Sequence, residues 1–470
     1  MCLLTRFGSS IAAVLILAAC SSGSSSGGSS PLANACASHN GQSINREAIA
    51  LSSSNSPDNA CMELHQYNLF EPNETEGFLR GDPRRPLVVD GEHQGLPYVL
   101  NTALFSDYTA KHRIVFLPKD ENGDFIPAEY RDADSNPDGT PGTGKLGKAN
   151  DNFIFPVGTV IAKSFTYPDT SLTGGPVERV IETRLLIKHT NTSDGSERWE
   201  GVTYVWTQDD ATDEWIARRQ NSSNGAGTFD EARSWHYPDP NDPDQIIEGS
   251  NAEGENPYSL PSRDNCITCH RNSDQDAGAA PIGLKARFLN RPYISEYGEF
   301  AAAPAELEAG DSVNQIEFWI TRGWLVEGPE ETADADGILT GTERIQPYNV
   351  PGDDNAPEAD LAARARGYLE VNCAHCHNQL RGVTSEGIPA AGVEDFYMEF
   401  QRQFCWANLF GQGNIEAGDA EDSTLYRRIS GNEGGNTPMP PLARQMVHEE
   451  GVEMIAAWIN NMPTDICADP

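Results

Sequence analysis

The stretch RVIETRLLIKH, Arg179 to His189, mixes β-branched and apolar residues with polar ones in the way typical of a β-strand. Further stretches of this kind are HRIVFLP (112–118), GTVIAKSFTY (158–167) and GVTYVWTQ (201–208). Turn-forming clusters such as DENGD, DTSLTGG and TNTSDGS separate them, and no long helical pattern interrupts the chain between about residues 65 and 245. We therefore predict an antiparallel β-sandwich or β-barrel for this part of the chain.

The composition changes after the polar segment PDPNDPDQIIEGSNAEGENP (238–257), which we interpret as a linker. Helices are predicted beyond it at 312–325, 360–372 and 445–462. The expected fold class is therefore α+β multidomain, with a β-rich N-terminal domain followed by two mainly α domains. The expected boundaries are 36–245 for the β-rich domain with a short disulfide-closed lead-in, 246–355 for the first α domain and 356–470 for the second.

The N-terminal stretch MCLLTRFGSSIAAVLILAAC (1–20) contains one positive residue, Arg6, then an apolar run and small residues. This pattern predicts an export signal, residues 1–19, rather than a membrane span. Cys20 directly after Leu-Ala-Ala resembles a bacterial lipobox, which implies cleavage before Cys20 and lipid on its thiol; an ordinary signal peptide is the alternative. By the same resemblance, Ser21 indicates the outer membrane. The Ser/Gly-rich residues 20–35 form a flexible tether. We expect a lipid-anchored protein of the bacterial envelope, facing the periplasm or the cell surface.

The charge balance restricts the partners of this protein. Its 470 residues include 33 Lys and Arg against 70 Asp and Glu, a formal net charge of -37. Such an excess excludes nucleic acid as a partner, since neutralising phosphates takes lysine and arginine. It favours a solvated acidic surface or a basic protein partner.

Two short motifs carry the chemistry. Cys266-Ile-Thr-Cys269-His270 and Cys373-Ala-His-Cys376-His377 both have the C-x-x-C-H spacing of c-type haem attachment. Two thiols at this spacing can each bond one porphyrin vinyl group, and the adjacent histidine can ligate the iron. A zinc site built from both motifs is disfavoured because about a hundred residues separate them. A redox dithiol is disfavoured because no βαβ unit surrounds either motif. We predict two haem c groups, one in each of the two mainly α domains, which we interpret as cytochrome c-type domains.

Each haem iron also has a second axial position. For the second haem we predict Met439, in the loop NTPMPPL after the motif and before the last helix. For the first haem, no methionine or histidine occurs between His270 and the second motif. The candidate is His236, in SWHYPDP; a weaker ligand such as Lys285 and an open position are the alternatives. Other residues available are Met62, His65, His93, His112 and His189. His375 is expected to face away from the iron, and His448 to be a structural residue.

The remaining cysteines and one acidic loop complete the candidate sites. In an oxidising envelope, Cys36–Cys61 and Cys405–Cys467 are candidate disulfides, although the sequence does not fix the pairing. The loop DADSNPDGTPGTGK (132–145) matches the first half of a calcium loop, but its twelfth position is Lys145 instead of the expected glutamate. We prefer a polar turn to a calcium site there.

Several stretches, taken in order, are similar to a family of uncharacterised bacterial diheme c-type cytochromes that are exported and often lipid-anchored. They are YVLNTALFSDYTAKHRIVFLP, FIFPVGTVIAKSFTYP, VIETRLLIKH, YSLPSRDNCITCH, SVNQIEFWITRGWL, ARGYLEVNCAHCHN and MPPLARQMVHEEGVEMIAAWI. The resemblance runs from about residue 65 to the C-terminus. It implies two covalent haems and a β-rich region of unassigned role, and it agrees with the motif residues and Met439.

The predicted function is electron transfer in the cell envelope through two haems, with exchange of electrons with a redox partner protein. The alternative is a haem-dependent oxidoreductase, peroxidase-like or other, in which the first haem is an open catalytic site and the second relays electrons. A third interpretation makes the β-rich region a binding module. The sequence does not identify the electron donor or acceptor.

Overall fold

The computed structural model describes most of the chain from residue 30 onward. The predicted flexible tether, residues 20–35, is wrong for its last five residues, because 31–35 belong to a helix that begins at Pro31. The described residues are 30–38, 41–52, 59–73, 79–131, 152–169, 177–190, 194–220, 228–229, 231, 233–239, 242–261, 266, 269–270, 281–293, 313–348, 358–377, 398, 414–431, 438–442 and 444–464. The predicted signal peptide, Cys20, the calcium-like loop and the Cys405–Cys467 pair lie outside these ranges. Within them, no helix combines the length and apolar character that crossing a bilayer requires.

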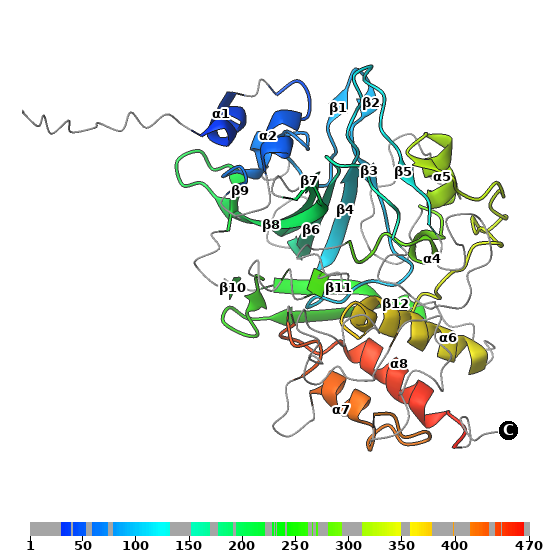
Figure 1. The fold of residues 1–470 in the computed structure, drawn as a ribbon. Helices are drawn as coiled ribbons and strands as arrows, with labels where there is room; N and C mark the ends of the chain where they lie inside the picture. Colours follow the sequence, from blue (N-terminus) through cyan, green and yellow to red (C-terminus); the bar gives the residue numbers. More distant parts are fainter. Residues whose placement is uncertain are drawn as a thin grey trace, which may run out of the picture.

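A six-stranded antiparallel sheet forms the centre of the fold (Figure 1). The order of its strands is β3 (Leu96–Pro97), β4 (Ala110–Phe116), β6 (Val160–Asp169), β7 (Val177–Thr190), β8 (Glu197–Gln208) and β9 (Trp215–Arg219). The four strands expected from the sequence are β4, β6, β7 and β8, so the antiparallel β-rich region is confirmed. β-branched and aromatic residues favour these strands because their side chains pack well on a pleated surface.

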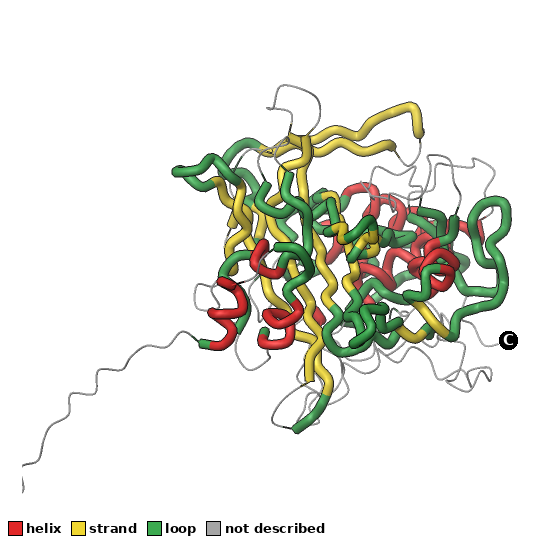
Figure 2. Tube along the Cα trace, turned by 90° about the horizontal axis from the view of Figure 1, so that it is seen from above, coloured by secondary structure: helices red, strands yellow, loops and turns green. Residues whose placement is uncertain are grey.

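The two faces of the sheet bury different sets of side chains. Successive residues of a strand point to opposite faces, so Ile114 and Ala162 belong to one core while Val115 and Ile161 belong to the other. Figure 2 shows the N-terminal helices on one side of the strands and the remaining helices on the other. The described parts of both covers are helices and irregular segments rather than a second large sheet. The expectation of a sandwich or barrel is therefore wrong for the described residues, since the six strands neither face another sheet of that size nor close on themselves.

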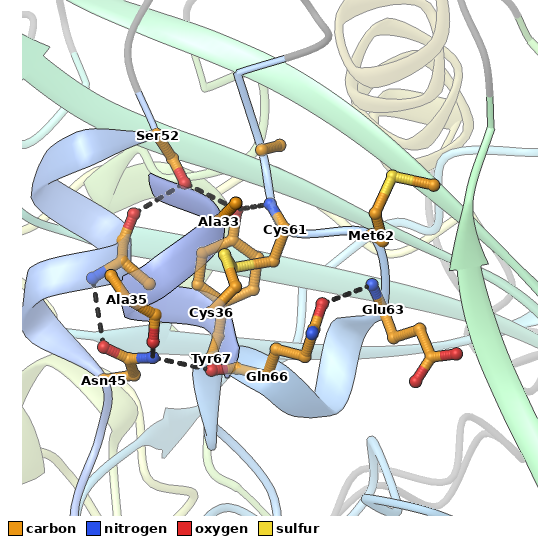
Figure 3. The surroundings of a disulfide bond; sticks show 12 residues. Ala33, Ala35, Cys36, Asn45, Ser52, Cys61, Met62, Glu63, Gln66 and Tyr67 are labelled. Carbon is orange, nitrogen blue, oxygen red and sulfur yellow. Dashed lines mark hydrogen bonds between the residues drawn. A yellow bond between two sulfur atoms is a disulfide. The ribbon is translucent and has the colours of Figure 1, made fainter. Parts of the chain in front are cut away.

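The first face is covered by the N-terminal lead-in, which comprises α1 (Pro31–Ser38), α2 (Arg46–Leu51) and η1 (Leu64–Tyr67). A disulfide joins Cys36 to Cys61, as the sequence suggested for this pair. Around it, the Tyr67 hydroxyl accepts a hydrogen bond from the Cys61 backbone at 3.0 Å and contacts Ser52 Oγ at 2.7 Å (Figure 3). Tyr67 is fully buried, so these bonds satisfy a polar group that burial would otherwise penalise.

The second face is covered by residues 281–293 and 313–345, which include α4 (Ala286–Leu289) and α5 (Gln315–Thr321). Their apolar side chains share one continuous core with the sheet, in which Leu284, Phe288 and Trp319 pack with Val115 and Ile161. Short β-pairs complete this part: β1 (Val88–Val89) with β2 (Glu92–His93), and β5 (Ala128–Glu129) with β14 (Leu325–Val326). The expectation of a separate mainly α domain at 246–355 is not met by its described part, because that part depends on the sheet for its core.

The segment interpreted as a linker is instead a β-hairpin. Strands β11 (Arg233–Asp239) and β12 (Asp242–Asn251) pair antiparallel across the expected boundary at residue 245. The hairpin uses a β-bulge at Pro238/Asp239, a device that lets a proline-containing strand keep its pairing. Strands β10 (Thr228–Phe229) and β13 (Tyr258–Ser259), which precede and follow the hairpin in the sequence, also pair antiparallel. A regular strand, β12, therefore occupies the position where the composition indicated a boundary between two domains.

The C-terminal helices form a third core. α6 (Glu358–Leu369) leads into a π-helical turn, η3 (Glu370–Ala374), and is followed by α7 (Thr424–Ser430) and α8 (Glu449–Asn460). The helices predicted near 312–325, 360–372 and 445–462 correspond to α5, to α6 with η3, and to α8. Trp458 and Ile455 of α8 pack against Leu369 and Leu425 in this core. Figure 1 shows these helices together at the end of the molecule away from α1 and α2.

Candidate cofactor-binding site

The second cysteine motif begins inside the π-helical turn η3. Cys373 is the fourth residue of this turn, and its carbonyl accepts hydrogen bonds from the backbone N–H of Cys376 at 2.9 Å and of His377 at 2.8 Å. Turns of π-helix within α-helices are rare and occur often at functional sites. The three motif residues are thus held in one tight backbone turn, which keeps their side chains near one another.

The second motif opens into a cavity of about 520 Å³. Cys373, Cys376 and His377 line this cavity together with Met439 and Met398. Its volume is within the range of about 300–1,000 Å³ that is usual for cofactor sites. The sequence predicted Met439 opposite this motif, and the structure brings both to one cavity. Met398 also lines it but was not predicted, because its stretch DFYMEF has no loop signal of the NTPMPPL kind.

Backbone hydrogen bonds position the Met439 loop. The N–H of Met439 donates to the Arg428 carbonyl at 2.9 Å, and the Met439 carbonyl accepts from Arg444 Nη1. Asp107, from the segment before β4, accepts hydrogen bonds from the backbone N–H of Gln445 and Met446 at 2.8 and 3.0 Å. The β-rich region therefore helps to fix the loop that carries the candidate thioether ligand.

His448 and Tyr368 form the wall of the cavity beside α8. The His448 ring stacks on Phe105 at 4.3 Å between centroids, and its Nδ1 lies 2.9 Å from the Tyr368 hydroxyl. Burial lowers the pKa of His448 to about 3, and the positive charges of Lys111 and Arg444 act in the same direction. Glu450 Oε2 lies 3.6 Å from His448 Nε2, a position that favours the imidazolium, but the effect of burial is larger. His448 is therefore a neutral structural residue, as the sequence suggested.

Cys266 of the first cysteine motif packs against strand β8 of the sheet. A Cβ atom placed on Gly201 would be 3.6 Å from Cys266 Cβ and 4.0 Å from its sulfur, so the missing side chain leaves room for the motif. The Cys266 thiol is hydrogen-bonded to Thr203, and burial raises its pKa above the ordinary value. The β-rich region is thus a direct support for the first motif, and was not expected to be so from sequence.

The two motifs meet in space. The sulfur atoms of Cys269 and Cys376 and a ring nitrogen of His375 all lie within 4.8 Å of one another. The hydrogen bond that the Cys269 thiol donates to Cys376, together with burial, raises the pKa of Cys269 to about 12. Burial likewise raises the pKa of Cys373 to about 12. All four motif cysteines are free thiols. His375, expected to face away from the iron, points toward the first motif.

Buried polar contacts connect the segments around both motifs. Arg287 of α4 donates to Glu370 of η3, with Nε 3.0 Å from Oε1, and both side chains are almost fully buried. The Asn372 side chain accepts from the Phe105 N–H at 2.8 Å. These contacts fix the second motif against the part of the chain that covers the sheet.

A smaller cavity of about 60 Å³ lies between the first motif and the sheet. Cys266 and His270 line it, but it is too small for a porphyrin ring. Among the described residues around it, His270 is the only histidine and no methionine occurs.

None of the other ligand candidates whose side chains the structure describes lines this cavity. His236 is on β11 opposite Glu248, and the structure does not describe its side chain. Met62 and His65 belong to the segment around η1, on the first face. His112 points away from the cavity, because the next residue of β4, Arg113, lines the cavity and successive residues of a strand point to opposite faces. Lys285 Nζ lies 3.7 Å from Glu370 Oε1, and the backbones of His93 and His189 are in β2 and β7.

The donor sets permit a test of the predicted cofactors. The second cavity fits a haem: it has two thiols at the correct spacing, a histidine next to them, a thioether in its lining and sufficient volume. The first cavity, as described, does not enclose a ring. The Cys269, His375 and Cys376 set could alternatively ligate zinc or another soft metal, since thiolate and imidazole are its usual donors.

No protein-family description, curated protein or solved structure matches this chain. The resemblance to diheme cytochromes therefore stays a prediction from the sequence, and the geometry of the two motifs has to support any assignment by itself.

Proposed function

We propose that this protein is a diheme c-type cytochrome that transfers electrons in the bacterial envelope. The observation that supports this most directly is the second cavity, whose walls bring Cys373, Cys376 and His377 together with Met439. Covalently bound haem would supply one-electron chemistry there. The chain would attach it through the two thiols, orient it by His377 and Met439, and shield it from water with Phe105 and the C-terminal core.

The meeting of the motifs supports transfer between two centres. Cys269 of the first motif lines the same cavity as Cys376 of the second. Cofactors attached through these neighbouring sulfurs would approach one another closely, so electrons could pass between them without a mobile carrier. We place the second centre as the relay of higher potential, because a thioether ligand raises the reduction potential.

The test is the haem content and spectrum of the protein expressed with a cytochrome maturation system. We expect two haems per chain in the pyridine haemochrome assay and a low-spin spectrum with the methionine–iron charge-transfer band. Bound zinc and no haem after the same expression would instead support a metal centre at Cys269, His375 and Cys376, and would reject the cytochrome assignment.

The sequence between the two motifs favours a second candidate function, a haem-dependent oxidoreductase. Between His270 and the second motif it contains no histidine or methionine that could be the second axial ligand of the first haem. An iron with an open position can bind and activate small ligands. Turnover of peroxide by the haem-loaded protein, with a high-spin signal that carbon monoxide removes, would support this function. Two six-coordinate, low-spin haems without peroxide turnover would exclude it.

We also propose a lipid anchor at Cys20 and a basic redox partner. The net charge of -37 would steer a positively charged protein toward the surface. Such attraction is screened by salt, so the association rate with the partner is expected to fall as ionic strength rises. Metabolic labelling with palmitate, lost in Cys20→Ser, tests the anchor. An association rate independent of salt would contradict the steering.

A further inference from the structure

Three cationic side chains form a row across the central sheet. In the strand register, Lys163 of β6 lies opposite Arg113 of β4 on one side and opposite Arg184 of β7 on the other. Directly opposite residues of an antiparallel pair point to the same face, with Cβ atoms about 4.5–5.5 Å apart, and like charges in this position are destabilising. The row is unexpected in a chain whose formal net charge is -37.

A neighbouring carboxylate balances part of this charge. Glu182 accepts hydrogen bonds from Arg184, with Arg184 Nε 3.0 Å from Oε2, and from the Tyr258 hydroxyl at 2.7 Å. Glu182 thus offsets one of the three positive charges. Lys163 Nζ lies over the Phe165 ring at 5.1 Å from its centroid, a contact that supplies no anion.

This row faces the smaller cavity beside the first cysteine motif. Arg113, Lys163 and Arg184 all line the cavity, and its other walls include the apolar side chains of Leu100, Ile161 and Leu186. The volume of about 60 Å³ is several times what one water molecule needs. The space therefore suits a small group with one anionic end and a short apolar body.

We propose that Arg113, Lys163 and Arg184 bind a carboxylate group in this cavity. Guanidinium groups match the two oxygens of a carboxylate, and the lysine adds a third donor. The apolar walls favour a carboxylate on a short alkyl chain over an inorganic anion. Two sources share this chemistry: the carboxylate arm of a haem whose ring lies outside the cavity, and a free short-chain acid.

The state of Lys163 in the ligand-free protein agrees with this assignment. Burial and the charges of Arg184 and Arg113 lower the pKa of Lys163 to about 7, while Glu182 and Cys266 oppose the shift. A bound carboxylate would add a negative charge next to the amine and restore its protonated form. The site would therefore take up a proton together with its ligand near neutral pH.

Calorimetric titration with butyrate tests the proposal, on the full-length haem-loaded chain and on Cys266→Ala/Cys269→Ala, which cannot attach a haem at the first motif. Lys163→Met is expected to weaken butyrate binding at least tenfold, and Lys163→Arg to retain it. The matched control is Lys111→Met. Lys111 is two residues from Arg113 on β4 and points to the same face of the sheet, but it does not line the cavity. Inorganic phosphate is expected to bind more weakly than butyrate. Circular dichroism verifies folding, and Lys163→Gln replaces Lys163→Met if that variant does not fold.

Each outcome decides one point. Butyrate binding to the haem-loaded chain, lost in Lys163→Met, supports a free acid as the ligand. Binding only to the chain without the first haem supports a carboxylate arm of that haem as the occupant. Absence of binding to both chains, or equal binding by Lys163→Met, overturns the proposal. The haemochrome assay separately reports whether any haem is attached, so failure of the cytochrome assignment would leave the titration informative.

Discussion

Arg287 and Glu370 form a buried ion pair that joins helix α4 to the π-helical turn of the second cysteine motif. Their side chains are 2% and 1% exposed, respectively. A second cation, Lys285 Nζ, lies 3.7 Å from the Glu370 carboxylate. A pair this deeply buried fixes the two segments in one arrangement, because neither charge can be left without its partner. The position of the second motif against the part of the chain that covers the sheet depends on it.

Replacing Glu370 by glutamine should destabilise the protein strongly. The substitution leaves the Arg287 guanidinium buried without its counter-charge, which typically costs about 3–5 kcal/mol. Urea unfolding followed by circular dichroism measures the loss. The control is Glu92→Gln, which breaks an exposed pair with Lys119 and should cost about 0–1 kcal/mol. Equal losses in the two variants would contradict a special role for the buried pair.

Enlarging Gly201 should prevent correct placement of the first motif. An alanine Cβ would lie 3.6 Å from Cys266 Cβ, an ordinary contact, so Gly201→Ala should be tolerated. The branched side chain of valine would extend into Cys266, and such overpacking costs about 1–3 kcal/mol. If both haems attach to the native protein, Gly201→Val should lower the haemochrome stoichiometry toward one per chain. Unchanged stoichiometry would show that attachment does not require the motif to rest on β8.

Substitution of Met439 should change the second centre alone. Met439→Ala removes the candidate thioether, so the methionine–iron band should disappear and the reduction potential of that centre should fall. Met398 lines the same cavity and provides a matched comparison, since Met398→Ala removes the same chemical group from another wall. Optical spectra and potentiometry distinguish the two. Loss of the band in Met398→Ala only would assign the ligand to Met398 instead.

Acid should destabilise the protein partly through His448. Its pKa is about 3 in the folded protein, against an ordinary value of 6.5 in the unfolded chain. At a pH between these two pKa values, the imidazole of His448 is protonated in the unfolded state but not in the folded state. The free energy of unfolding therefore falls as the pH decreases through this window, by up to about 1.4 kcal/mol per pH unit.

His448→Gln removes this titration, so its stability should depend less on pH between 6.5 and 4.5 than that of the native protein. Tyr368→Phe is the control, because it removes the hydrogen bond to His448 but leaves the imidazole in place. Thermal unfolding at several pH values compares the three proteins. A native-like pH dependence in His448→Gln would show that other groups cause the acid sensitivity.

The sequence predicted the strands and helices whose patterns are local. The β-branched and apolar residues of 179–189 and the helical spacing of Val452, Ile455 and Ile459 each lie within one element, so they can be recognised without knowing the neighbours. The hairpin at 233–251 was missed because prolines and aspartates are typical of loops. What stabilises it includes the close approach of the Trp235 ring to Gly249, where a Cβ would collide with the ring. Such a contact between two strands leaves no signal in either stretch alone.

The candidate site was predictable in its residue types and not in its assembly. The spacing within each motif identified Cys266, Cys269, Cys373 and Cys376, and the loop composition identified Met439. Nothing in the sequence indicated that Cys269 would lie beside Cys376, since that depends on contacts between segments about a hundred residues apart. The sequence also did not indicate the row of Arg113, Lys163 and Arg184, because each of the three strands contributes only one basic residue to it.

The Cys36–Cys61 disulfide has a mechanical consequence. Cys36 lies in α1, and Cys61 lies three residues before Leu64, the first residue of the η1 segment that packs on the sheet. Tension applied to the chain ahead of Pro31 would pass from Cys36 to Cys61 through the sulfur–sulfur bond. The residues between them, including α2, form a closed loop that carries none of this load. A protein held at that end could therefore be pulled by its surroundings without its lead-in being unravelled, and reduction of one bond would lengthen the tether.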